Sequence, residues 1–148
     1  MPATPDGCIL AFDYGSRLIG VAIGNPLSGS SRALTTLVNG ERGPDWTRID
    51  ALVGEWMPVA LVVGLPLALD GSDQDITRSA RAFASALQSR QARPVHLCDE
   101  RYSSQEAARR FAGRRAQGTA RRKDAQSLDA LAAAVILDNW LATQSSGG

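Results

Sequence analysis

Three carboxylates in this 148-residue chain stand at positions where they could bind a divalent cation. Asp13 and Glu100 each follow closely on a short apolar run of the kind that forms a strand. Asp129 stands one turn inside an Ala-rich helical pattern, so that Ala132 and Ala133 share its face. A carboxylate on such a face needs a partner, because an unpaired buried charge is costly in free energy.

Metal coordination would supply that partner. Oxygen ligands without His or Cys suit Mg²⁺ or Mn²⁺, and these ions polarise a phosphodiester, lower the pKa of a bound water and offset charge on the leaving oxygen. The carboxylates therefore favour metal-assisted phosphodiester hydrolysis. The residues alone leave simpler interpretations open: Asp13 as a turn residue, Glu100 as a surface charge, and Asp129 as a charge favoured by a helix dipole.

The elements that would position these carboxylates alternate between strands and helices. Apolar runs at 8–12 and 18–24 predict a β-hairpin, and 32–38 could add a third strand. Pro44 opens a helical pattern, as a first-turn residue, that should end before Pro58. Further strands are predicted at 59–63 and 94–98, and further helices at 76–87, from Ser103, and at 127–142.

This order predicts one α/β domain over residues 1–148, with flexible tails near 1–6 and 143–148. Its core would be a mixed five-stranded sheet with helices on both faces. Asp13, the Gly64-Leu65-Pro66 turn and Glu100 all come just after predicted strands. If those strands are parallel, all three places lie on the rim where open α/β sheets bind ligands.

Four motifs occur in order between about Ile9 and Leu141. They are Asp13-Tyr14-Gly15 with Arg17 to Ala22, Val62 to Pro66 with Asp70-Gly71, Asp99-Glu100-Arg101 with Ser103-Ser104 and Glu106-Ala107, and Leu128-Asp129 with Ala132-Ala133 and Ile136-Leu137. Together they resemble the YqgF (RuvX) family. The resemblance implies an RNase H-like fold and a nuclease, described for 5′-end maturation of pre-16S rRNA or, earlier, as a Holliday junction resolvase.

By the same resemblance, Asp13, Glu100 and Asp129 form the catalytic and metal-binding triad. Related junction resolvases carry a fourth carboxylate three residues before the helical aspartate, where this chain has Gln126. The resemblance therefore does not imply a fully liganded second metal. Arg17 and Arg101 stand beside acidic positions and could contact a phosphate or balance the carboxylates. The predicted substrate-binding residues near the triad are Gly15, Arg17, Gly64, Leu65, Pro66 and Arg101.

A basic segment at residues 109–123 has no acidic residue, although the whole chain carries a formal net charge of only +1. It lies between Glu100 and Asp129 in the chain, so we interpret it as a surface that follows a phosphate backbone. The alternative is a solvated helix face and loop. Its cations are Arg109, Arg110, Arg114, Arg115, Arg121, Arg122 and Lys123.

The remaining sequence features indicate location and packing. Cys8 and Cys98 lie in apolar runs, as free thiols do in a reducing compartment, and no export signal or membrane span is evident, so we expect a cytoplasmic protein.

His96 lacks a second ligand at metal spacing and is interpreted as a packed or edge histidine. Trp46, Trp56 and Trp140 are predicted to pack in the core, whereas Tyr14 and Tyr102 are candidates for base stacking.

Two other classes of function compete with a nuclease. One is an RNA-binding module that acts in ribosome assembly or transcription without cleavage, although all three acidic positions are retained. The other is an ATP-binding protein of the actin and sugar-kinase kind, which needs two such domains. A Rossmann dinucleotide site is excluded because no Gly-x-Gly-x-x-Gly follows a strand.

We expect the partner to be nucleic acid, RNA rather than DNA, within ribosomal precursor particles. The sequence leaves open whether the protein is a monomer or a homodimer.

Overall fold

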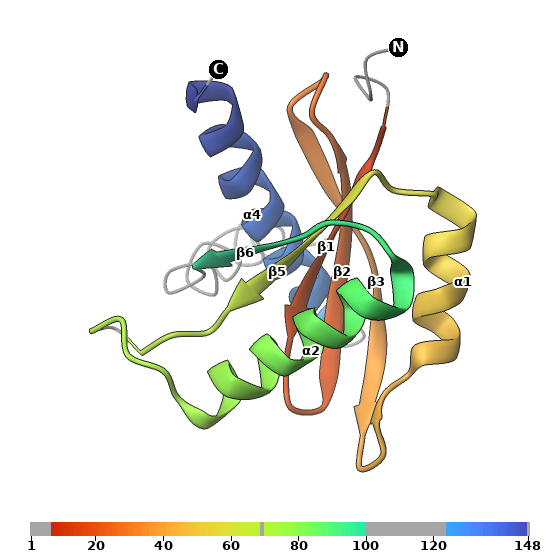
Figure 1. Cartoon of the computed structure of the whole chain (residues 1–148), viewed down its shortest axis with the longest axis vertical. Coiled ribbons are helices and arrows are strands. Elements are labelled where there is room, and N and C mark those ends of the chain that lie inside the picture. The colour runs from red at the N-terminus through yellow and green to blue at the C-terminus, as the bar shows by residue number, and fades with distance from the viewer. Residues whose placement is uncertain (1–6, 69, 100–123, 148) are drawn as a thin grey trace.

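The chain builds one mixed β-sheet with helices on both faces, as the computed structural model describes it for residues 7–68, 70–99 and 124–147 (Figure 1). The sheet order is β4-β3-β2-β1-β5-β6. Strands β1 to β4 pair antiparallel, and β1, β5 and β6 pair parallel. The elements are β1 Ile9–Tyr14, β2 Leu18–Asn25, β3 Ser30–Gly40, β4 Gly43–Pro44, α1 Trp46–Trp56, β5 Ala60–Leu65, α2 Asp75–Gln91, β6 Val95–Asp99 and α4 Asp124–Gly147.

The expected α/β architecture with a mixed sheet is confirmed, but the sheet has six strands rather than five. The additional strand, β4, is two residues long and pairs Pro44 with Asn39 of β3. Pro44 was predicted in the first turn of a helix, and this was wrong. The helix begins after Asp45, whose side chain accepts a hydrogen bond from the Arg48 N–H at 3.2 Å and so caps it.

The other helix ends differ less from expectation. Helix α1 ends at Trp56, before Pro58, because Met57 adopts a left-handed conformation with φ of 47°. Helix α4 begins at Asp124 and continues to Gly147, through residues expected to form a tail, because no proline or glycine interrupts it before that point. The helix predicted from Ser103 lies outside the described residues.

The two faces of the sheet pack on different helices, as alternation along β1 shows. Leu10 and Phe12 are buried in a cluster with residues of α1 and α2, whereas Ile9 and Ala11 pack with Ile136 of α4. Figure 1 shows α2 in front of the sheet and α4 behind it. Side chains at odd positions of β1 therefore face α4.

The aromatic side chains contribute to this packing. Trp46 stacks on Phe83 with the ring centroids 5.5 Å apart, which confirms its predicted core role. Tyr14 lies against the same ring at 5.2 Å, so it packs in the core cluster rather than standing free to stack on a base. At the opposite face, Trp140 lies 5.0 Å from the exposed His96 on β6.

In the described part of the chain, no helix is long and apolar enough to cross a membrane.

Candidate functional site

The carboxyl ends of the three parallel strands lie along one edge of the sheet. Phe12 pairs with Val63, so Asp13 and Gly64 are the next residues of β1 and β5. One residue further, Leu65 pairs with Asp99, the last residue of β6. The predicted rim is therefore present for Asp13 and for residues 64–66. Gly64 and Leu65, however, were predicted to form a turn, and this was wrong: both are buried in β5, because they continue its pairing with β6. Glu100, the residue after β6, lies outside the described residues.

Asp13 belongs to the face of the sheet that α4 covers. Its position is odd, like those of Ile9 and Ala11, which pack against α4. Across the antiparallel ladder it is paired with Gly20 of β2. Asp13 is half-buried there. The strand pairing thus sets which helix lies opposite this carboxylate.

Gly20 brings that helix unusually close. A Cβ atom on Gly20 would lie only 1.9 Å from the carbonyl oxygen of Asp129, so the α4 backbone occupies the space that a side chain would need. Further along β2, Ala22 packs with Ala133 and Ala134 of α4. Because Gly20 is the ladder partner of Asp13, Asp13 and Asp129 come to neighbouring positions on one face of the sheet.

The surroundings of Asp129 are apolar, as its helical pattern predicts. Ala132, Ala133 and Ile136 are all buried. Desolvation by this partial burial raises the pKa of the Asp129 carboxyl above its ordinary value. Helix α4 begins at Asp124, so Asp129 stands beyond the first turn, where the helix dipole no longer favours a charge. The dipole interpretation of Asp129 therefore loses its support.

We expect Asp129→Asn to raise the thermal unfolding midpoint at pH 7 in metal-free buffer. Because burial raises the folded-state pKa of Asp129, the stability that this group contributes is full below its unfolded pKa of about 3.9 and is lost as the pH rises through the folded value. The gain in the unfolding midpoint should therefore vanish at about pH 3. Circular dichroism melts at both pH values measure it, with Glu55→Gln on the exposed side of α1 as control. A midpoint at pH 7 that stays unchanged or falls would contradict the expectation.

The donor set at this edge fits a hard divalent cation, but it is incomplete in the described part of the chain. Asp13 and Asp129 contribute carboxylate oxygens, the ligands that Mg²⁺ and Mn²⁺ prefer. Among the described residues, no group of three His, Cys, Asp or Glu side chains is close enough to hold a metal. The third predicted ligand, Glu100, lies outside those residues.

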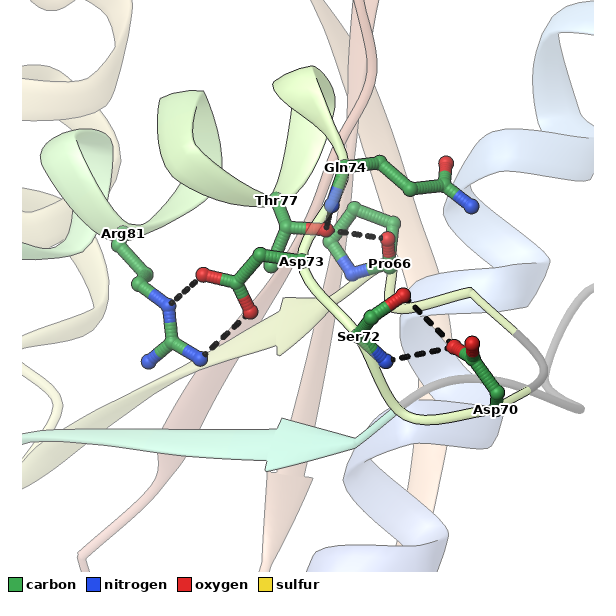
Figure 2. A network of polar contacts seen from close by, with 7 residues as sticks. All are labelled: Pro66, Asp70, Ser72, Asp73, Gln74, Thr77 and Arg81. Atoms are coloured by element: carbon green, nitrogen blue, oxygen red, sulfur yellow. Dashed lines mark hydrogen bonds and ion pairs between the residues drawn. The ribbon is translucent and has the colours of Figure 1, made fainter.

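The turn after β5 is fixed from helix α2 (Figure 2). The fully buried Thr77 donates its hydroxyl to the Pro66 carbonyl at 2.7 Å and accepts the Gln74 N–H at 3.0 Å. Within the loop, the Asp70 carboxylate accepts from the Ser72 N–H at 2.9 Å and from its hydroxyl at 2.6 Å. These bonds fix the loop that leaves β5 at Pro66, at the edge of the sheet that contains Asp13.

The turn between β1 and β2 forms the opposite border of this edge. Gly15 N–H donates to the Leu18 carbonyl at 3.0 Å, which closes the turn and leaves Arg17 exposed. In the part of the chain that the structure describes, no carboxylate forms an ion pair with Arg17. The predicted cations Arg101, Arg114, Arg115, Arg121, Arg122 and Lys123, and also Tyr102, lie outside the described residues.

Two features of this site had no place in the interpretation of the sequence. One is the close approach at Gly20, for which the alternating small residues Gly20, Ala22 and Gly24 of β2 are the only signal. The other is Asn39 of β3, whose side chain bonds to the β1–β2 turn. Nothing in the pattern around Asn39 indicates that bond.

Comparison with known proteins identifies relatives over nearly the whole chain. Residues 7–143 match the family described as "RuvX: Holliday junction resolvase". A protein of Xanthomonas axonopodis pv. citri (strain 306), named "Putative pre-16S rRNA nuclease", is 53% identical over 138 residues, which cover 93% of this chain and 89% of that protein. A protein of Xylella fastidiosa (strain M23) with the same name shows the same identity and coverage.

Solved structures show a similar fold at low sequence identity. RuvC of T. thermophilus, in complex with a Holliday junction substrate, matches with a TM-score of 0.57 and 15% identity, over 93% of this chain and 96% of that one. The yeast mitochondrial Holliday junction resolvase Ydc2 matches with a TM-score of 0.54 and 11% identity, over 97% and 81% of the two chains. These matches establish an RNase H-like fold of the RuvC type.

Proposed function

This chain belongs to the RuvX (YqgF) family, and on that basis we propose that it is a divalent-metal-dependent nuclease. The observation that carries the proposal is the Gly20 contact, which brings Asp129 beside the strand position of Asp13. The substrate we propose is the 5′ end of precursor 16S rRNA, because curated relatives at 53% identity carry that name. The family description makes a four-way DNA junction the second candidate.

We assign the catalytic and metal-binding roles to Asp13, Glu100 and Asp129. Bound Mg²⁺ or Mn²⁺ would supply an activated water and offset charge on the leaving oxygen. Support for Glu100 comes from the sequence, in which it directly follows β6. Two residues of β6, His96 and Cys98, contact α4: the Cys98 Sγ lies 3.9 Å from the Ile136 carbonyl oxygen.

We assign substrate binding to the turns that border the edge and to the basic segment. Gly64 and Leu65 are buried in β5, so Pro66 is the residue of this motif that could meet a phosphate backbone beside Asp13. Arg17 supplies an exposed guanidinium on the other side. On the evidence of the sequence, we also assign nucleic-acid binding to Arg101 and to the cations from Arg114 to Lys123, which would contact phosphates further along the nucleic-acid strand.

The direct test is cleavage of two substrates by the purified chain. We expect it to cut a 5′-extended 16S precursor RNA in the presence of Mg²⁺ or Mn²⁺, and not in the presence of a chelator. Cleavage of a four-way DNA junction in preference to that RNA would favour the resolvase function instead. RNA binding without cleavage of either substrate, at any metal concentration, would favour an assembly factor that has no catalytic role.

A further inference from the structure

The β1–β2 turn is held from outside its own hairpin by one asparagine of β3. The Asn39 side chain donates from Nδ2 to the Gly15 carbonyl at 2.7 Å, and its backbone N–H donates to the Arg17 carbonyl at 2.8 Å. The two bonds reach both ends of the three-residue turn. A β-hairpin turn usually fixes itself through its own residues, so this turn has additional support from a third strand.

The Asn39 side chain is buried. Asn39 is 6% exposed, and among the described residues only Asn39 and Thr77 have buried polar side chains. A buried amide without a partner is unfavourable, so the bond from Nδ2 to the Gly15 carbonyl is specific rather than incidental. Thr77 plays the corresponding part in the turn after β5, where it bonds to Pro66.

The turn that Asn39 fixes presents Arg17 beside the strand end that carries Asp13. Arg17 is exposed and has no ion pair with any carboxylate of the described residues. A long cationic side chain on an unfixed turn would lose much conformational entropy when it binds a phosphate. Fixing the backbone of the turn in advance reduces that loss.

We infer that Asn39 is a positioning residue for nucleic-acid binding, which acts by holding the Gly15-Ser16-Arg17 turn so that Arg17 meets a substrate phosphate. The inference rests on the proposed function of the same edge. We assign Asn39 no direct contact with the substrate or with a metal. Its effect passes through the backbone of the turn to Arg17.

A neutral substitution gives the sharpest test, because Asn39→Ala removes no charge. The slope of log Kd against log salt reflects how many phosphates the protein neutralises, and it falls by roughly 0.7 for each phosphate of a single strand that is no longer neutralised. We expect Asn39→Ala to lower this slope, as Arg17→Ala does, and to raise Kd for a single-stranded RNA oligonucleotide roughly 3- to 10-fold. In cleavage, KM should rise with kcat little changed, since the phosphate interaction binds ground and transition states alike.

Two further variants separate positioning from a general loss of structure. In the double variant Asn39→Ala with Arg17→Ala, Kd should equal that of Arg17→Ala alone, because the first change acts through the second residue. Asn25→Ala is the matched control: Asn25 Oδ1 accepts the Leu27 N–H at 2.7 Å in the β2–β3 turn, at the other end of the sheet. It should leave slope and KM unchanged.

Gly15→Ala keeps the test valid if Asn39→Ala does not fold. A Cβ atom on Gly15 would lie 2.5 Å from the Leu18 carbonyl oxygen, so this variant opens the same turn and should give the same lower slope. The inference is overturned and the proposed function stands if Arg17→Ala binds RNA as the wild type does. The same holds if Arg17→Ala weakens binding but Asn39→Ala and Gly15→Ala leave the slope at its wild-type value. If the wild-type chain binds no nucleic acid, both are overturned.

Discussion

Asp13→Asn is expected to lower kcat for cleavage by at least about 10²–10³-fold while the chain remains folded. The substitution keeps the shape of the side chain and removes its charge at the end of β1, opposite the place where α4 contacts Gly20. Loss of one anionic ligand removes electrostatic stabilisation that the reaction requires and weakens the site for a divalent cation. Single-turnover cleavage of the precursor RNA at saturating Mg²⁺ measures the effect.

The matched control is Asp50→Asn, which also removes one carboxylate. Asp50 lies on α1, on the opposite side of the sheet, where it pairs with Arg90 at 3.2 Å. An exposed ion pair of this kind contributes little to stability, so kcat and the unfolding midpoint should stay near the wild-type values. If Asp13→Asn cleaves as fast as Asp50→Asn, Asp13 has no place in the catalytic set.

Gly20→Ala is the second substitution for which we expect a large effect, although it adds only one methyl group. The new Cβ would overlap the backbone of Asp129 at 1.9 Å, and a helix backbone cannot yield as a flexible side chain can. Helix α4 must therefore move away from β2. We expect the free energy of unfolding to fall by about 1–3 kcal/mol or more. We also expect kcat to fall by roughly 10²-fold, because displacing a catalytic group by about 1 Å has that consequence.

Gly54→Ala provides the comparison for this variant. Gly54 lies inside α1, and a Cβ atom there would meet nothing within 4 Å. Because alanine favours the helix more than glycine does, this variant should be more stable than the wild type by up to about 1 kcal/mol, with unchanged kcat. Urea unfolding and the cleavage assay on both variants decide the matter. Wild-type stability and kcat in Gly20→Ala would show that α4 does not need this contact to position Asp129.

Local patterns were sufficient to predict most of the fold. The apolar runs around Phe12 and Val62 predict strands, and the spacing of Ile49 and Val53 predicts helix α1, because each of these signals lies within one segment of the sequence. The pairing of Pro44 with Asn39 could not be read in this way. A two-residue strand has no period, and its existence depends on β3 lying beside it.

The same distinction applies to the candidate site. Asp13 and Asp129 could be proposed because one follows a strand and the other interrupts an apolar helix face, and each feature is local. The roles of Gly20 and Asn39 could not be predicted, since each depends on a contact with a segment remote in the sequence. The Gly20 contact spans more than a hundred residues, from β2 to α4.

The central claim is that Asp13 and Asp129 act together with Glu100 as ligands of one divalent cation, and calorimetric titration of Mn²⁺ tests it most directly. We predict one tight site in the wild-type chain, which is lost in both Asp13→Asn and Asp129→Asn. Burial raises the pKa of Asp129, so protons should compete with the ion and the affinity should fall as the pH is lowered through that value. Mn²⁺ binding that is equally tight in both variants, or two equally tight sites in the wild type, would contradict the account.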